Sequence, residues 1–174
     1  ETVIPLSIQI DGFFLVSQAV EVLPGQEGAA QRVPISDGDR SDRAYLPGTS
    51  LKGALRGQAM RIWRTVSGNT NKNDIPEAVK WLFGSTDYAG RLKVSDFVAE
   101  RRRAPKQVEM VAIDRFTGGA SHGAKFSVLA HESPCLTGNL SIDDFEVSTE
   151  TRDQALGLLV LLLRDLDEGD IPLG

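Results

Sequence analysis

The chain has 174 residues, 41% of them apolar and 25% charged, which is the balance of one compact globular domain. A formal net charge of −5 disfavours a protein that coats nucleic acid through its overall field, so any nucleic-acid contact must be local. The single cysteine, Cys135, cannot form an internal disulfide, and a reducing, cytoplasmic location is expected. The longest apolar run, residues 158–163, is too short to cross a membrane, and no membrane partner is expected.

The N-terminal part begins with a strand and continues into a long polar segment. Leu6, Ile8 and Ile10 alternate with polar residues, which is the period of a half-buried strand, and a first strand is predicted over residues 3–17. Residues 24–48 contain repeated prolines, glycines and aspartates and are too long and too polar for a simple connector. A loop of this kind is expected to be functional or disordered.

A helix is predicted next, from near Ser50 to residue 67. Pro47 and Gly48 interrupt the preceding chain, and Thr49 or Ser50 is expected to cap the exposed amides. Apolar residues then recur at helical spacing and are expected to bury one face. They are Leu51, Leu55, Ala59, Ile62 and Val66.

This helix start has the features of a phosphate site. Lys52 and Arg56 are one turn apart, so both side chains fall on one side near the positive end of the helix dipole, where free amides favour an anion. The alternative is an ordinary solvated basic face. A nucleotide P-loop does not fit, because residues 48–53 lack the Gly-Lys-Ser/Thr ending.

Shorter elements follow. Asp74 is expected to cap a short helix that Gly84 ends, and a strand is predicted from Leu92 to near Val98. Residues 108–114 and 126–132 are predicted to pair as an extended hairpin.

The C-terminal part contains one more strand and one more helix. Residues 140–142 form a predicted short strand, and a capping-box pattern of Thr151 with Gln154 starts a helix that is apolar nearly all round and ends at Gly169. The element order predicts an α+β fold with helices on one face of an antiparallel sheet, as in ferredoxin-like or RNA-recognition folds.

Three separated segments resemble the RAMP superfamily, the repeat-associated RNA-binding proteins of CRISPR systems. Residues 45–56, Tyr-Leu-Pro-Gly-Thr-Ser-Leu-Lys-Gly-Ala-Leu-Arg, are similar to its signature helix start. Residues 82–84 with 90–96 resemble its second segment, and residues 111–120 resemble its Ile-Asp-Arg-x-Thr-Gly segment. The likeness is greatest to the backbone subunits of type III effector complexes, which stack along a guide RNA.

The resemblance implies a modified ferredoxin-like fold, in which an inserted hairpin acts as a thumb between guide and target. It implies a single RAMP-type domain over residues 1–174 and guide-phosphate contacts by Ser50, Lys52 and Arg56, with Gly48 and Thr49 beside them. The Gly-rich loop and closing strand of the family are expected just after residue 174. The chain is therefore expected to be a fragment or one unit of a longer polypeptide.

The thumb segment supplies further expected contacts. Arg115 is expected to contact RNA, whereas Asp114 is expected to pin the hairpin base or to pair with Arg115. A hairpin tip rich in small residues allows close approach of a nucleotide. The contacts expected there are Gly118, Gly119, Ser121, His122 and Lys125. His122 and His131 have no cysteine or carboxylate at ligand spacing, so no metal site is expected from them.

Cleaving members of the superfamily place an aspartate in the loop before the signature helix, where it assists a divalent metal and a water. In this chain that position falls on Gln31 or Arg32, and neither side chain holds a hard cation as a carboxylate does. Asp37, Asp39 and Asp42 could substitute for that aspartate, and Asp37 and Asp39 are the candidate catalytic residues, with Mg²⁺ as the cofactor if they act. No other cofactor is expected.

The expected function is that of a guide-RNA-binding backbone module of a type III effector. Its expected partners are the guide RNA, a complementary target RNA and neighbouring subunits or fused domains of the same family. One alternative is an endoribonuclease, either a metal-dependent enzyme that cuts target RNA or a metal-independent guide-processing enzyme that uses His122 or another loop group as acid and base. The other is a domain that binds only protein, which the acidic balance favours.

Overall fold

The structure is a computed structural model that describes residues 1–19, 32–34, 42–69, 71, 73–113, 115–143 and 147–173. Side chains are not described for residues 18, 19, 32–34 and 120–126. The chain divides into two compact units, and each is treated separately. Unit 1 comprises residues 1–6, 47–97 and 138–173, and unit 2 comprises residues 7–46 and 98–137.

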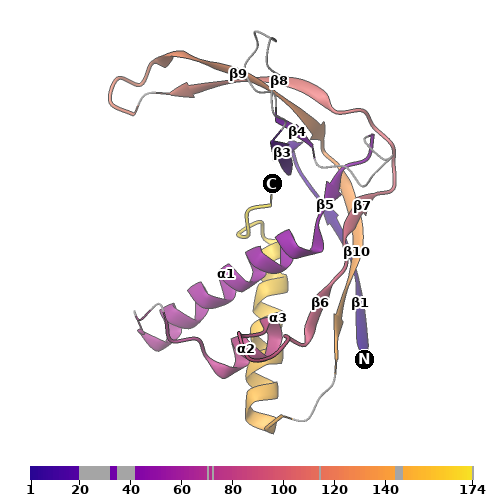
Figure 1. The fold of residues 1–174 in the computed structure, drawn as a ribbon, viewed down its shortest axis with the longest axis vertical. Helices are drawn as coiled ribbons and strands as arrows, with labels where there is room; N and C mark the ends of the chain where they lie inside the picture. The colour runs from indigo at the N-terminus through magenta and orange to yellow at the C-terminus, as the bar shows by residue number, and fades with distance from the viewer. Residues whose placement is uncertain are drawn as a thin grey trace. The chain divides into compact units, whose positions relative to one another are not determined.

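Figure 1 shows the elements. Unit 1 contains helices α1 (Gly48–Ser67), α2 (Glu77–Phe83) and α3 (Thr149–Asp167) and strand β6 (Leu92–Val94). Strands β1 (Thr2–Gln9), β7 (Phe97–Ala99) and β10 (Cys135–Ile142) contribute residues to both units. Unit 2 contains β2 (Phe13–Phe14), β3 (Ser17–Ala19), β4 (Arg32–Pro34), β5 (Tyr45–Leu46), β8 (Lys106–Ile113) and β9 (Ala120–Glu132).

The core of unit 1 lies between its helices and its strands. β6 pairs antiparallel with β10, with Leu140 opposite Val94. The three helices α1, α2 and α3 contact one another, and α1 also contacts β6 (Figure 1). Side chains from all of these elements are fully buried, which confirms the predicted α+β class. They include Leu51, Leu55, Leu82, Leu92, Leu140 and Leu162.

Helix α1 begins at Gly48, two residues before the predicted start. Leu51, Leu55 and Ala59 are completely buried, as their spacing predicts. The expectation for Val66 is wrong, because 80% of its side chain is exposed. Burial along α1 stops at Ala59, so the apolar stripe continues into turns that the core does not cover.

The predicted starts of the other two helices also need correction. Pro76 rather than Asp74 occupies the N-cap of α2, and the Asp74 carboxylate instead accepts a hydrogen bond from Asn69. α3 is capped by Ser148, whose hydroxyl accepts from the Thr151 amide, so the capping residue lies three positions before the predicted one. Gly84 and Gly169 follow α2 and α3 as predicted, and both adopt a positive φ, of 93° and 81°.

Strand β9 organises unit 2. It pairs antiparallel with β8 from Lys106 opposite Ala130 to Val111 opposite Lys125. β8 begins two residues, and β9 six residues, before the strands predicted for the hairpin. It also pairs antiparallel with β2, and in parallel with β4 where Arg32 lies opposite Val128. Because β4 pairs in parallel with β9, the pairing around β9 is not wholly antiparallel. β4 belongs to the segment 24–48, which was predicted as a loop.

Several predicted strands change their limits. The predicted strand 3–17 is divided into β1, β2 and β3, with Gly12 at a φ of 92° beside the first break. The predicted strand 92–98 is divided into β6 and β7 by a turn at Ser95 and Asp96. The predicted strand at 140–142 is the end of the eight-residue β10.

Candidate nucleic-acid interface

The start of α1 is held against the turn between β6 and β7. The Gly48 amide donates a hydrogen bond to the Asp96 carboxylate at 2.8 Å. A Cβ on residue 48 would lie 2.3 Å from the Val94 carbonyl oxygen and 2.6 Å from that of Ser95, so only glycine permits this approach. The turn therefore fixes the first turn of α1 within unit 1.

The predicted capping by Thr49 or Ser50 is wrong. Pro47 occupies the N-cap position, and no side chain of its own can cap the helix. Asp96 satisfies the Gly48 amide instead, and this carboxylate is supplied by a distant segment of the chain. Thr49 and Ser50 are consequently left exposed on the surface of the first turn.

Lys52 and Arg56 form a pair of cations at this helix start. Both are half-buried, and within the described part of the chain neither makes an ion pair. The first turn of α1 contains no acidic residue. Burial lowers the pKa of Lys52, and the nearby charge of Arg56 lowers it further. An anion bound between the two side chains would offset both effects.

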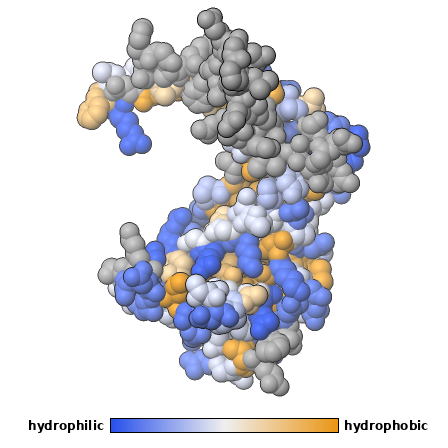
Figure 2. All heavy atoms as spheres, in the orientation of Figure 1, coloured by the Kyte–Doolittle hydropathy of each residue, from blue (hydrophilic) through white to orange (hydrophobic). Residues whose placement is uncertain are grey.

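Figure 2 shows hydrophilic side chains over much of the surface of unit 1, which contains the three helices. On α1 this surface combines exposed hydroxyls, two half-buried cations and the positive end of the helix dipole. Asp96 is a nearby negative charge that sequence reasoning missed, although it ends the second of the three resembling segments. Its carboxylate engages the Gly48 amide, so the amide is not available to a ligand.

The β8–β9 hairpin of unit 2 exposes both cationic and apolar side chains. Arg115 is exposed at the tip, where Gly118 has a φ of 68° and Gly119 follows it. Phe116 is 99% exposed and Ile113 is 66% exposed, and sequence reasoning did not identify either as a surface residue. The sequence feature that could have identified these two residues is their position in the Ile-Asp-Arg-x-Thr-Gly segment.

The tip itself is shorter than predicted. Ser121, His122 and Lys125 lie in β9 rather than at the tip, because the hairpin strands pair as far as Ile113 and Ala120. The side chains of these three residues lie outside the described part of the structure.

A comparison with protein-family models decides the family. The model of the RAMP superfamily matches residues 24–174, which include α1, the β6–β7 turn and the whole β8–β9 hairpin. The chain belongs to the RAMP superfamily. A search among curated proteins finds no match. Membership supports a CRISPR-associated role in RNA binding for this RAMP protein.

Within the described residues, no helix combines the length and apolar character needed to traverse a bilayer.

The residues singled out for catalysis cannot be placed. Asp37, Asp39 and Gln31 lie outside the described residues, as does Asp114 of the thumb segment. Arg32 is described only in its backbone, which belongs to β4.

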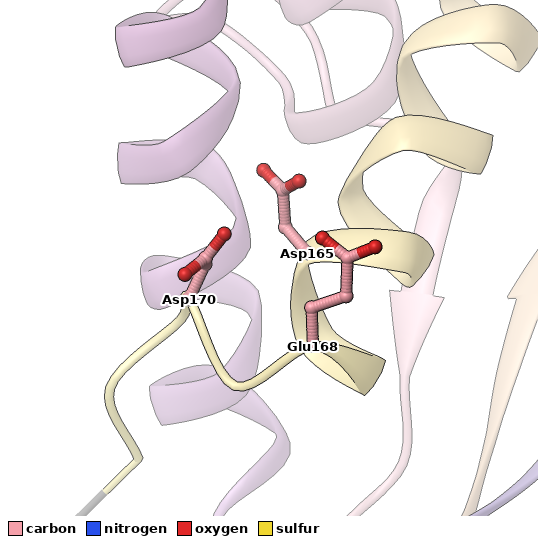
Figure 3. A group of neighbouring side chains, drawn as sticks. All are labelled: Asp165, Glu168 and Asp170. Atoms are coloured by element: carbon pink, nitrogen blue, oxygen red, sulfur yellow. The ribbon is translucent and has the colours of Figure 1, made fainter.

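One acidic cluster of this RAMP protein was not anticipated. Asp165 and Glu168 at the end of α3 and Asp170 just after it place carboxylate oxygens within 4.8 Å of one another (Figure 3). Asp165 accepts a hydrogen bond from Gln58 of α1 at 2.5 Å, and Glu168 pairs with Arg164 at 2.8 Å. The Asp165 contact links α3 to α1, and the Glu168 contact joins this residue to Arg164 four positions earlier. Both carboxylates therefore have a structural role.

His131 is the one histidine whose side chain the structure describes, and it is buried. It is 3% exposed, and its Nε2 has no hydrogen-bond partner among the described residues. Burial lowers its pKa, while a hydrogen bond with the Arg103 backbone and the charge of Asp42 act in the opposite direction. The imidazole is therefore neutral at neutral pH.

This burial makes stability depend on pH. Because the folded-state pKa of His131 lies below its unfolded value of about 6.5, the unfolded chain binds a proton first as the pH falls. The free energy of unfolding is expected to decrease below about pH 6.5. Denaturant unfolding of the wild type and His131→Gln between pH 5 and 8 measures the effect. A parallel pH dependence in the two proteins would contradict it.

Proposed function

We propose that this RAMP protein is a guide-RNA-binding backbone module of a type III CRISPR effector. In this role it holds the phosphate backbone of the guide and spaces the guide–target duplex during antiviral defence. The observation that carries the proposal is the pair Lys52 and Arg56, two cations without an acidic partner among the described residues at the positive end of α1.

The chemistry of this helix start suits a backbone ligand. A phosphate there would accept hydrogen bonds from two cationic side chains and from the exposed hydroxyls of Thr49 and Ser50. Such contacts set the register of a nucleic acid and contain no base code. A guide-binding subunit must accept guides of any sequence, which these contacts allow.

The hairpin supports the same function from unit 2. Phe116 offers a ring on which a base can stack, and Arg115 beside it offers a guanidinium for phosphate or stacking. We place the thumb role, between guide and target, on this tip. Neighbouring subunits and the target RNA are the further partners of the proposed module.

Cleavage assays on the assembled effector test whether the module holds RNA or cuts it. Labelled target and guide-precursor RNA are incubated with and without Mg²⁺, using wild-type protein and the variants Asp37→Asn, Asp39→Asn and His122→Gln. Bound RNA and equal cleavage rates in all proteins are expected. A rate lost only in an aspartate variant with Mg²⁺ present would make the protein the target endonuclease instead.

Nuclease treatment separates the proposal from a domain that binds only protein. The purified effector is digested with ribonuclease, and the protein is followed by size-exclusion chromatography. A protected guide fragment that copurifies with this chain supports the proposal. Subunits that stay assembled around this chain with no protected RNA would overturn it.

A further inference from the structure

Helix α3 has an apolar outer face in addition to its buried one. The side chains that it buries are Ala155, Leu158, Leu159 and Leu162. On the opposite side, Val160 is 66% exposed, Leu161 43% and Leu156 37%. Apart from the helix's own backbone, no atom of the described residues lies within 4 Å of the place that a Cβ on Gly157 would take. A surface helix normally presents polar residues on this side, so an apolar outer face suits contact with another protein surface.

The outer face follows the spacing of a seam between two helices. Its central positions recur at intervals of four, three and four residues, and they are Asp153, Gly157, Val160 and Arg164. Gly157 and Val160 are equally far from the midpoint between residues 158 and 159, and so are Asp153 and Arg164. A second α3 that runs antiparallel about a two-fold axis at this midpoint therefore brings Val160 of each copy to Gly157 of the other.

The charges of the seam favour a second copy in this orientation. Asp153 is exposed and makes no ion pair or side-chain hydrogen bond with the part of the chain that the structure describes. The Arg164 side chain is 69% exposed, although its Nε pairs with Glu168. The antiparallel arrangement places Asp153 of each copy opposite Arg164 of the other, whereas a parallel one would pair like with like. Opposite charges thus meet twice around an apolar centre.

We infer that the outer face of α3 binds the same face of a second copy of this chain, with the two helices antiparallel. Val160 fills the open space over Gly157 of the other copy, and the absence of a side chain at Gly157 lets the helices approach closely. Glu150 and Asp167 continue the seam at its ends and would bring acid opposite acid, so the contact is limited to the central turns. The dimer is therefore weaker than interfaces of about 1,200–2,000 Å².

Sedimentation equilibrium of the full chain over a concentration series tests this self-association without any RNA. A monomer–dimer equilibrium is expected, and Val160→Asp should weaken it at least about tenfold, since an unpaired carboxylate would be buried in each copy. Val66→Asp is the matched control, because Val66 is 80% exposed on α1 and lies outside the seam. It should leave the dimer unchanged, and circular dichroism checks that both variants are folded.

Exchange of the two charges tests the orientation. Arg164→Asp alone should weaken the dimer, because it then sets two acids against each other on both sides of the axis. Adding Asp153→Arg to it should restore the dimer, since opposite charges meet again. Restoration is specific to the antiparallel pairing, because in a parallel dimer each position would still face its own like charge.

Disulfide formation tests the register. Gly157→Cys and Val160→Cys are each made together with Cys135→Ala, which removes the single native thiol. When the two proteins are mixed and oxidised, the mixed disulfide should form faster than either disulfide between identical chains. Faster linkage between two Val160→Cys chains would overturn the antiparallel register. A chain that stays monomeric at every concentration would overturn the inference itself and assign the outer face to a different protein.

These results are independent of the proposed function. RNA binding by a chain that never dimerises counts against the α3 contact alone. A dimer that forms in a chain without affinity for RNA counts against the proposed function alone.

Discussion

Replacing Lys52 and Arg56 together by alanine is expected to lower the affinity for guide RNA at least about tenfold, since each 1.4 kcal/mol lost is a factor of ten. The slope of log affinity against log salt concentration should flatten by about 1.4, which corresponds to two charges at about 0.7 each for single-stranded RNA. The reason is that both cations lack acidic partners in the described part of the chain and stand at the positive end of α1. Fluorescence anisotropy across a salt series measures both quantities.

A matched control uses cations at the other end of the same helix. Arg61→Ala with Arg64→Ala removes the same charge from the last turns of α1 and should leave most of the affinity. Equal losses for the two double variants would contradict the site and indicate only a general charge effect.

The lowered pKa of Lys52 adds a second readout to this prediction. A bound phosphate favours the charged ammonium, so the affinity should fall as the pH rises through that lowered pKa. Lys52→Arg keeps its charge over the same range and should bind with little dependence on pH.

Gly48→Ala is expected to give the largest loss of stability among single-methyl changes in α1. The added Cβ would lie 2.3 Å from the Val94 carbonyl oxygen and 2.8 Å from the Ser95 carbonyl carbon, and both are backbone atoms. Relieving that overlap must move the helix start or the β6–β7 turn, at a cost of about 3 kcal/mol. The melting temperature should fall by about 6–12 °C for a chain of this size. Thermal denaturation followed by circular dichroism measures it.

Gly53→Ala provides the opposite expectation in the same helix. No atom lies within 4 Å of the position that its Cβ would take, and alanine favours a helix over glycine. This variant should gain about 0.5–1 kcal/mol. The prediction is contradicted if Gly48→Ala matches the wild type or if both variants change stability in the same direction.

Local sequence patterns predicted the elements whose causes are local. The buried stripe of Leu51, Leu55 and Ala59 follows the helical period, and the stops at Gly84 and Gly169 follow from the freedom of glycine to adopt a positive φ. The β8–β9 hairpin was predicted because its two strands follow each other in the sequence with only a short Gly-containing segment between them.

The errors of the sequence analysis occur where a distant segment completes the element. Asp96 takes the capping role that was assigned to Thr49 or Ser50, because the β6–β7 turn reaches the helix start. β4 was assigned to a loop because a three-residue strand has too little periodicity to recognise, and it forms by pairing with β3 and β9.

For the candidate site, the sequence by itself determined the family and the two cations at the start of α1. The motif order marks the RAMP superfamily, and the spacing of one helical turn places Lys52 beside Arg56. Only the tertiary structure decided that Asp96 holds the Gly48 amide and that Gln58 of α1 donates to Asp165 of α3. Such groupings join residues far apart in the chain. No local period encodes them, because they arise only when strands pair and helices pack.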